Sequence, residues 1–374
     1  MAATHRALVL HSTSSPLSLD TLPIPLATPG AVIVKVLGMT IIPYLKDILD
    51  GTLPYTITTP MIPGSNCIAR IHAVGPDSVS LKEGQLVLCD ITVRARDDPN
   101  AAILMGMHGG AAPTLMSGEW RHGTYAEYAK FPLENIFPLN EDILFGKLGY
   151  KVEDLCSVSN YLVPYGGLSE IDLKPGDTII VAPATGKFGG GAVGTALAMG
   201  ANVIACGRNA STLSIMSSVF AETGRLSTYV LTGDVEIDTK ALTGLANNGK
   251  GADAYIDFSP PTAAKSTHIQ ACMGALRIKG KACFMGGVAG GVEIKYELVM
   301  MKTPTSLPAT SSNFLLRSLL TEDGNGCSYT SLVRRMNTNM PKWLIGLILT
   351  VTVVSMLAAI FWGCSGSKKH KEPK

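Results

Sequence analysis

The sequence predicts an α/β protein in which a β-rich domain precedes a doubly wound parallel sheet and a C-terminal transmembrane helix follows both. The prediction rests on features of three segments. Short β-branched runs separated by Pro and Gly occupy residues 1–150. From residue 151 on, strand-like runs alternate with helical runs, as in βαβ units. An uncharged apolar stretch then occupies residues 343–362.

The composition is that of a folded protein without a strong charge bias. The chain has 374 residues, of which 46% are hydrophobic and 16% charged, and it is long enough for two domains with buried cores. A formal net charge of +2 gives no sign of a nucleic-acid-binding protein. The 8 cysteines include no C-x-x-C pair, so we expect reduced and mostly buried thiols rather than a disulfide framework.

The first domain, residues 1–150, is expected to consist mainly of short strands. Its β-branched runs are "RALVLHS", "AVIVKVLGM", "CIARIHAVG" and "QLVLCDITV". The polar, glycine-rich residues 94–123 are expected to form a long loop.

The second domain, residues 151–302, has the alternation typical of a parallel sheet covered by helices. Strands are expected at 177–184, 202–207, 228–233, 253–259 and 281–287, and helices at 192–199, 211–220, 237–246 and 263–276. Residues 303–342 are rich in Pro, Ser and Thr at their start and are expected to form a linker. The fifth strand would then be an unpaired edge of the sheet.

The stretch 343–362 predicts a single transmembrane helix. A helix of that length spans about 30 Å, the thickness of the hydrocarbon core of a bilayer. Trp343 and Trp362 stand at its two ends, where interfacial aromatic residues belong, and a basic tail follows at 363–374. The N-terminal residues lack an apolar run long enough for a secretory signal. We therefore expect a single-pass C-terminal anchor whose main body is cytosolic.

A glycine-rich stretch follows the first strand of the second domain. Such a strand–turn–helix unit presents backbone N–H groups and the positive end of a helix to an anion. The stretch is not a P-loop, because Val181 and Phe188 stand where that motif needs Gly and Ser or Thr. The strict G-x-G-x-x-G pattern is also absent, and a purely structural turn is the alternative. The candidate residues for binding a dinucleotide diphosphate are Thr185, Gly186, Lys187, Gly189, Gly190 and Gly191.

The end of the next strand indicates which dinucleotide would bind. Arg208 and Asn209 stand there, about twenty residues past the turn. A carboxylate at this place accepts from the ribose 2′-hydroxyl of NAD, whereas an Arg suits the 2′-phosphate of NADP. We therefore predict NADP(H), with a solvated Arg208 as the alternative. Gly286 and Gly287 follow the fifth strand, and Asp257, Phe258 and Ser259 end the fourth, where the nicotinamide half would lie.

The ordered motifs resemble those of a known superfamily. "GTYAEY" at 123–128, "LKPGDTIIV" at 173–181 and "ATGKFGGGAV" at 184–193 follow a β-rich first domain. Together they resemble the medium-chain dehydrogenase/reductase superfamily, in its zinc-type alcohol dehydrogenase and quinone oxidoreductase group. The resemblance covers roughly residues 5–300. It implies a GroES-like first domain, a Rossmann second domain and a possible homodimer.

The zinc-ligand pattern of that group is missing. Pro63, Gly64, Ser65 and Asn66 stand where zinc-dependent members carry Gly-His-Glu after a Pro, and the early Cys is absent from "MTIIPYLKD". The spacing of His72, His108 and His122 indicates no site either. We therefore expect no metal.

Without zinc, the resemblance implies hydride transfer from NADPH with a tyrosine as proton donor. The segment 43–55 matches the neighbourhood in which some members carry this donor, so Tyr55 or Tyr44 is the candidate and Asp47 the accompanying polar residue. The alternative is that both tyrosines only pack in the core.

The sequence thus predicts a membrane-tethered, zinc-independent, NADPH-dependent oxidoreductase that reduces an aldehyde, ketone or conjugated enone. Its partners would be this small-molecule substrate and a lipid bilayer, with no nucleic acid. The alternative is a non-catalytic, membrane-anchored protein that keeps the fold and binds a nucleotide or serves as a scaffold.

Overall fold

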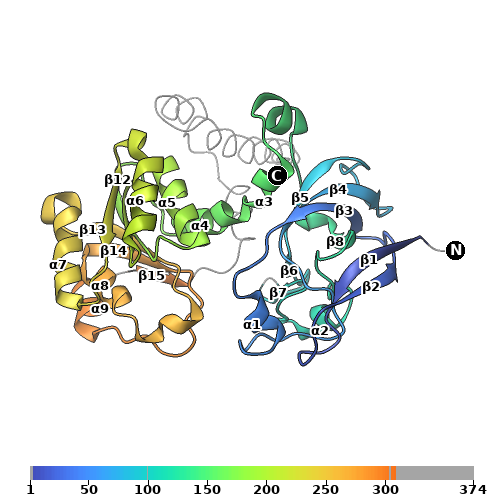
Figure 1. The fold of residues 1–374 in the computed structure, drawn as a ribbon, viewed down its shortest axis with the longest axis horizontal. Coiled ribbons are helices and arrows are strands. Elements are labelled where there is room, and N and C mark those ends of the chain that lie inside the picture. The colour runs from blue at the N-terminus through green and yellow to red at the C-terminus, as the bar shows by residue number, and fades with distance from the viewer. Residues whose placement is uncertain (1–2, 99, 303–304, 309–374) are drawn as a thin grey trace, which may run out of the picture. The chain divides into compact units, whose positions relative to one another are not determined.

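The computed structural model describes residues 3–98, 100–302 and 305–308 (Figure 1). Contacts divide these residues into two compact units, the first ending at Val158 and the second beginning at Ser159. Each unit has its own buried apolar clusters and is described by itself.

The first unit is built on a five-stranded antiparallel sheet with the order β8-β3-β4-β5-β9. Its strands are β3 (Ala31–Met39), β4 (Cys67–Val74), β5 (Leu86–Cys89), β8 (Tyr128–Pro132) and β9 (Ile136–Pro138). Two separate hairpins join β1 (Thr4–Val9) to β2 (Ser18–Pro23) and β6 (Thr92–Arg94) to β7 (Ala102–Leu104). The core includes Val34, Val87 and Phe131, all fully buried.

The expected strand over 85–93 is broken at Asp90. The carboxylate of this buried residue accepts hydrogen bonds from the N–H and the hydroxyl of Thr92, both at 3.0 Å, which turns the chain out of β5. The expected long loop also contains β7 and a short helix, α2 (Pro113–Ser117). Two further short α-helices of this unit are α1 (Leu45–Leu49) and α3 (Val152–Cys156).

The second unit contains a six-stranded parallel sheet with the order β12-β11-β10-β13-β14-β15. The strands are β10 (Thr178–Ala182), β11 (Asn202–Gly207), β12 (Leu226–Val230), β13 (Ala252–Asp257), β14 (Leu276–Phe284) and β15 (Thr305–Pro308). The chain runs outward from β10 to β12 and then returns to β13 on the other side of β10. The neighbours β10 and β13 therefore form a topological switch point, where such sheets bind ligands.

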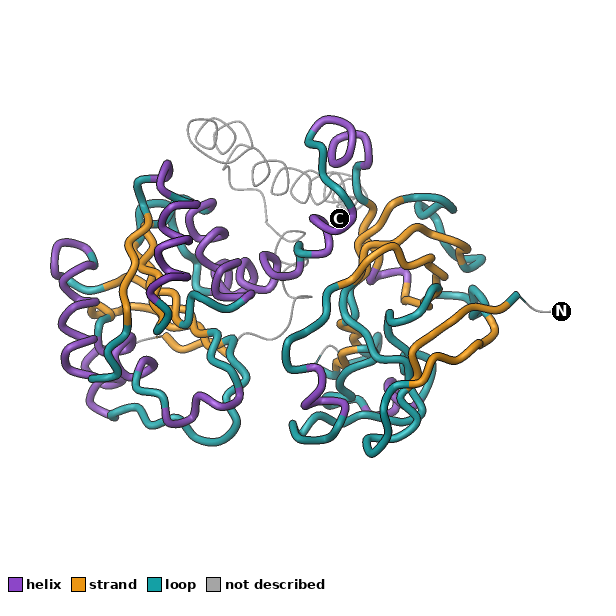
Figure 2. Tube along the Cα trace, in the orientation of Figure 1, coloured by secondary structure: helices purple, strands orange, loops and turns teal. Residues whose placement is uncertain are grey.

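Helices cover both faces of this sheet, as the purple and orange tubes of Figure 2 show. Ile179 of β10 belongs to a cluster with Leu168 and Val193, whereas the next residue, Ile180, belongs to one with Leu242. Alternate side chains of a buried strand thus fill two cores. The helices are α4 (Ser159–Glu170), α5 (Lys187–Ala198), α6 (Ala210–Val219), α7 (Val235–Leu245), α8 (His268–Gly274) and α9 (Tyr296–Lys302).

Two features of this unit differ from the expectation. Residues 305–308, expected in a linker, form β15, which pairs with β14 from Lys281↔Thr305 to Phe284↔Pro308, so the predicted unpaired edge of β14 is wrong. A strand of four residues is too short to give a periodic signal. The helix expected over 263–276 begins only at His268, because the proline-led residues Pro261–Lys265 form a 3₁₀ turn.

No helix among the described residues is long and apolar enough to cross a bilayer. The transmembrane helix expected at 343–362 lies outside the described residues, as does the basic tail at 363–374.

The contact between α5 and α4 predicts a pair of substitutions with opposite effects. A Cβ on Gly191 would lie 1.9 Å from the backbone oxygen of Asn160, so Gly191→Ala should lower the free energy of unfolding by about 1–3 kcal/mol. A Cβ on Gly190 would lie 3.7 Å from the nearest atom, so Gly190→Ala should raise the free energy of unfolding by up to about 1 kcal/mol. Urea unfolding of both variants checks this, and equal midpoints would contradict the packing seen here.

Candidate dinucleotide site and proton-donor cluster

The start of α5 lies at the switch point and is the candidate diphosphate site. Gly186 is the N-cap residue, and α5 begins at Lys187 directly after the turn that follows β10. The N–H groups of a first helical turn have no partner within the helix, and the helix dipole places positive charge there. A Cβ on Gly186 would meet no atom within 4 Å, so this backbone faces open space.

The glycines of this stretch divide into two kinds. The helix was expected to start at 192, but Gly189, Gly190 and Gly191 lie inside it. A Cβ on Gly189 would lie 2.0 Å from the backbone oxygen of Pro183, and one on Gly191 would meet α4, so packing accounts for both. Gly186 and Gly190 have room around them, and packing does not require them to be glycine.

Thr185 and the end of β11 lie next to this helix start. A Cβ on Gly207 would lie 2.8 Å from Cγ2 of Thr185, which brings the end of β11 against the turn. Arg208 follows and is exposed. The side chain of Asn209 caps α6 by accepting a hydrogen bond from Thr212 N at 3.1 Å, so this candidate has a structural role. The sequence carries no carboxylate between Asp177 and Glu222.

The ends of β13 and β14 form the other side of the switch point. Ser259 N donates to Oδ2 of the buried Asp257 at 3.0 Å, which turns the chain directly after β13. Ser259 O accepts from Gly287 N at 3.0 Å. A Cβ on Gly286 would lie 2.5 Å from Asp257 Oδ2, so Gly286 packs directly on the carboxylate, whereas Gly287 faces open space.

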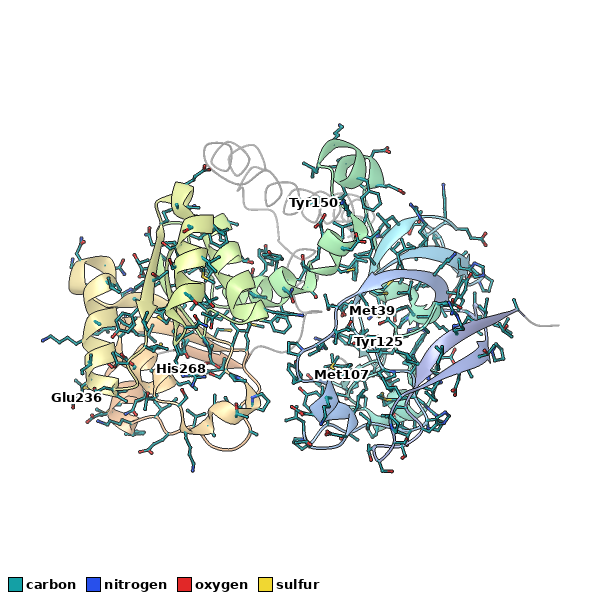
Figure 3. All side chains as sticks on the ribbon, viewed as in Figure 1. Met39, Met107, Tyr125, Tyr150, Glu236 and His268 are labelled. Carbon is teal, nitrogen blue, oxygen red and sulfur yellow. The ribbon has the colours of Figure 1, made fainter. Side chains whose placement is uncertain are left out.

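His268, labelled in Figure 3, joins this turn and was missed by the sequence analysis. Ser259 Oγ lies 2.6 Å from Asp257 Oδ1 and 2.9 Å from His268 Nε2. An ionised carboxylate only accepts, so the single hydroxyl proton of Ser259 goes to Asp257, and His268 Nε2 donates to Ser259 Oγ. No periodic signal marks His268, because it lies within the run expected to be one long helix.

Asp, Ser and His side chains also occur together in hydrolases. The arrangement of Asp257, Ser259 and His268, however, excludes Ser259 as a nucleophile. Ser259 is 1% exposed, and its proton points to Asp257 rather than to His268. Burial alone would raise the pKa of Asp257, but the imidazole of His268, whose Nε2 lies 3.5 Å from Oδ1, and the hydrogen bonds from Ser259 and Tyr255 outweigh it and hold the pKa below its usual value. The carboxylate therefore stays charged and organises the groups around it.

Two aromatic rings flank the switch point. Phe188, in the first turn of α5, and Phe258, directly after β13, stack with their ring centroids 6.2 Å apart and their planes 17° apart. Both side chains are half-buried.

The candidate tyrosines lie in the first unit and pack against its core. Burial, and then repulsion from Tyr55, raises the pKa of Tyr44 to about 12, and burial also raises the pKa of Tyr55. The ring of Tyr55 lies 4.7 Å from that of His108, whose Nδ1 accepts from Thr56 N at 3.0 Å. Burial lowers the pKa of His108, so its ring is neutral at pH 7 and carries its proton on Nε2. Asp47 is half-buried in α1.

The residues that replace the zinc ligands form hydrogen bonds within the fold. Ser65 Oγ donates to Thr40 O at 2.6 Å, and Asn66 Oδ1 accepts from Ile91 N at 3.0 Å. Within the described ranges, no group of three or more His, Cys, Asp or Glu side chains is placed to hold a metal ion. His72 packs on Tyr128 at 4.8 Å, and His122 Nδ1 accepts from Ile62 N. Ser65 and Asn66 are thus engaged in hydrogen bonds, and neither is a Cys, His or carboxylate of the kind that binds zinc.

A β-rich unit followed by a doubly wound sheet with a helix start at its switch point is an arrangement that also occurs in two-domain dinucleotide-binding proteins. Residues 28–141 match the family model described as the alcohol dehydrogenase GroES-like domain. The resemblance to the medium-chain dehydrogenase/reductase superfamily is thereby confirmed.

Curated relatives match part of the chain. An alcohol dehydrogenase of Moraxella sp. (strain TAE123) is 28% identical over 202 residues, which are 54% of this chain and 57% of the relative. A zinc-type alcohol dehydrogenase-like protein of Schizosaccharomyces pombe is 27% identical over 175 residues, 47% of each chain. The match thus spans about half the length of these curated relatives.

Solved structures share the fold of most of this chain. AibC superposes with a TM-score of 0.67 at 17% identity and covers 96% of this chain and 95% of its own. A short chain alcohol dehydrogenase of E. coli CFT073 with NADH gives 0.66 at 18% identity, covering 84% and 86%. A candidate zinc-binding dehydrogenase of Sinorhizobium meliloti 1021 bound to NADP gives 0.65 at 17%, covering 81% and 83%. The expected GroES-like and Rossmann-like folds are confirmed.

The lowered pKa of Asp257 predicts a pH-dependent stability. A carboxyl group whose pKa is lower in the folded state than in the unfolded state stabilises the fold at pH values above its unfolded pKa of about 3.9. This stabilisation is lost as the pH falls through the pKa of the folded state. Asp257→Asn should therefore lower the free energy of unfolding by about 1–3 kcal/mol at pH 7 and reduce its fall below about pH 5. Urea unfolding at several pH values measures both effects. Asp172→Asn, at an exposed position, is the control, and parallel curves for Asp257→Asn and the wild type would refute the prediction.

Proposed function

We propose that this chain is a zinc-independent, NADPH-dependent oxidoreductase that reduces an aldehyde, ketone or conjugated enone. The observation that carries the proposal is the start of α5 at the switch point of the sheet, with open space at Gly186 and the exposed Arg208 at the end of the neighbouring strand. Solved structures of the same fold include proteins with NADP and with NADH, which supports a nicotinamide cofactor.

The chain's own residues supply binding and a proton. When bound, NADPH supplies the hydride. The first turn of α5 binds the diphosphate, and Arg208 pairs with the ribose 2′-phosphate. Tyr55 or Tyr44 holds the proton for the reduced product, since both phenols stay protonated at neutral pH. This mechanism needs no zinc, because the chain itself provides the groups that bind the cofactor and the group that donates the proton.

We further propose that residues 343–362 anchor the protein in a bilayer and that the main body is cytosolic. The uncharged length of this stretch and its terminal Trp343 and Trp362 support the anchor. The full chain should float with liposomes and resist alkaline carbonate extraction, whereas a chain truncated before Trp343 should not. Equal extraction of the two would remove this part of the proposal.

The role of Arg208 predicts a change in cofactor preference. Removing one charge-assisted contact to a phosphate should raise the Kd for NADPH about tenfold in Arg208→Ala and leave the Kd for NADH unchanged. Titration calorimetry on both cofactors measures this. Lys265→Ala removes another exposed cation of the same unit and should change neither constant. If the wild-type chain bound no NADPH, the proposed function would be wrong.

The proton donor predicts a loss of turnover without a loss of binding. Tyr55→Phe or Tyr44→Phe, whichever residue is the donor, should lower kcat about 10²–10⁴-fold and leave the Kd for NADPH unchanged. Loss of NADPH absorbance across a panel of aldehydes, ketones and enones gives the rates, and a metal chelator should not change them. Tight binding of NADPH without turnover on any substrate would instead favour the non-catalytic alternative.

A further inference from the structure

We propose that Ser259 and His268 are positioning residues that hold the ends of β13 and β14 for the nicotinamide half of the bound dinucleotide. This inference rests on the proposed function. Neither side chain is accessible enough to touch a ligand, since Ser259 is 1% and His268 6% exposed. Their effect would therefore pass through the backbone that they fix.

Asp257 holds the turn that follows β13. Asp257 accepts from Ser259 twice, from the backbone N–H at 3.0 Å and from the hydroxyl at 2.6 Å. Both the backbone and the side chain of Ser259 are thereby held by one charged group. Tyr255 also donates to Asp257, at 2.8 Å, from within the strand. The carboxylate is thus fixed from the strand side and fixes Ser259 in turn.

The same turn is connected to the end of β14. Ser259 O accepts from Gly287 N, and Asp257 O accepts from Met285 N, both at 3.0 Å. The position of Ser259 therefore sets the path of residues 285–287. A Cβ on Gly287 would meet no atom within 4 Å, so this backbone borders space that a ligand can enter. In a doubly wound sheet such strand ends border the bound dinucleotide.

The turn is also connected to a helix. His268 is the first residue of α8, and its Nε2 donates to Ser259 Oγ at 2.9 Å. Its Nδ1 is bonded to the hydroxyl of the exposed Ser266. Ser259 Oγ then donates one hydrogen bond and accepts one, so the turn is tied to both β13 and α8. Without His268 the buried hydroxyl loses its donor and α8 no longer holds the turn.

The binding of two ligands distinguishes a positioning role of Ser259 and His268 from a general effect on stability. NADPH carries the nicotinamide half, whereas 2′-phospho-ADP-ribose carries only the part expected at α5 and Arg208. Using the full chain, we expect Ser259→Ala and His268→Leu to raise the Kd for NADPH about tenfold and to leave that for 2′-phospho-ADP-ribose unchanged. His268→Gln should restore NADPH binding, because its side-chain amide can donate to Ser259 Oγ.

Ser266→Ala is the control variant for this experiment. Ser266→Ala changes the exposed end of the same chain of hydrogen bonds and should leave both constants close to those of the wild type. If Ser259→Ala does not fold, the comparison of His268→Leu with His268→Gln carries the test. If the variants lost affinity equally for both ligands, or for neither, the inference would be overturned. Binding of NADPH by the wild type would in that case still support the proposed function. Failure of the wild type to bind either ligand would overturn both.

Discussion

The candidate cofactor site depends on how closely α5 approaches the backbone around it. Gly189 and Gly191 let the helix lie against the turn after β10 and against α4, at distances that no side chain would allow. This approach directs the first turn of α5 at the switch point, between the ends of β10, β11 and β13. A bulkier sequence would move the helix away from the sheet, and its N–H groups would no longer converge where a diphosphate could bind.

Most of the fold could be predicted from the sequence, because strong periodic runs meet strong turn signals. The run "AVIVKVLGM" forms β3 over the whole predicted range, and "NVIACG" forms β11 likewise. Predictions failed where a local interaction overrides the pattern. Asp90 breaks one strand by accepting from Thr92, and the prolines before His268 delay a helix. The strand β15 could not be predicted, since its pairing with β14 is a long-range contact.

The candidate site was only partly visible in the sequence. The glycine stretch and Arg208 stand out because their residue types suit phosphate chemistry at known offsets from a strand. The sequence could not separate Gly186, which faces open space, from Gly189, which packs against Pro183, since that depends on the surrounding backbone. It also could not join Ser259 to His268, because folding brings the start of α8 to the end of β13. Among the tyrosines, burial of Tyr44 and Tyr55 could not be inferred from their spacing.

The charge distribution around the start of α5 has a consequence for how this protein is handled. No acidic side chain interrupts the sequence between Asp177 and Glu222, and Arg208 lies in this interval. The helix end and the guanidinium therefore favour a small oxyanion, and no acidic side chain of this interval opposes it. Under the proposed function, inorganic phosphate or sulfate in a buffer should compete with NADPH, and rising ionic strength should weaken NADPH binding. The affinity measured for NADPH will then depend on the salt in the buffer.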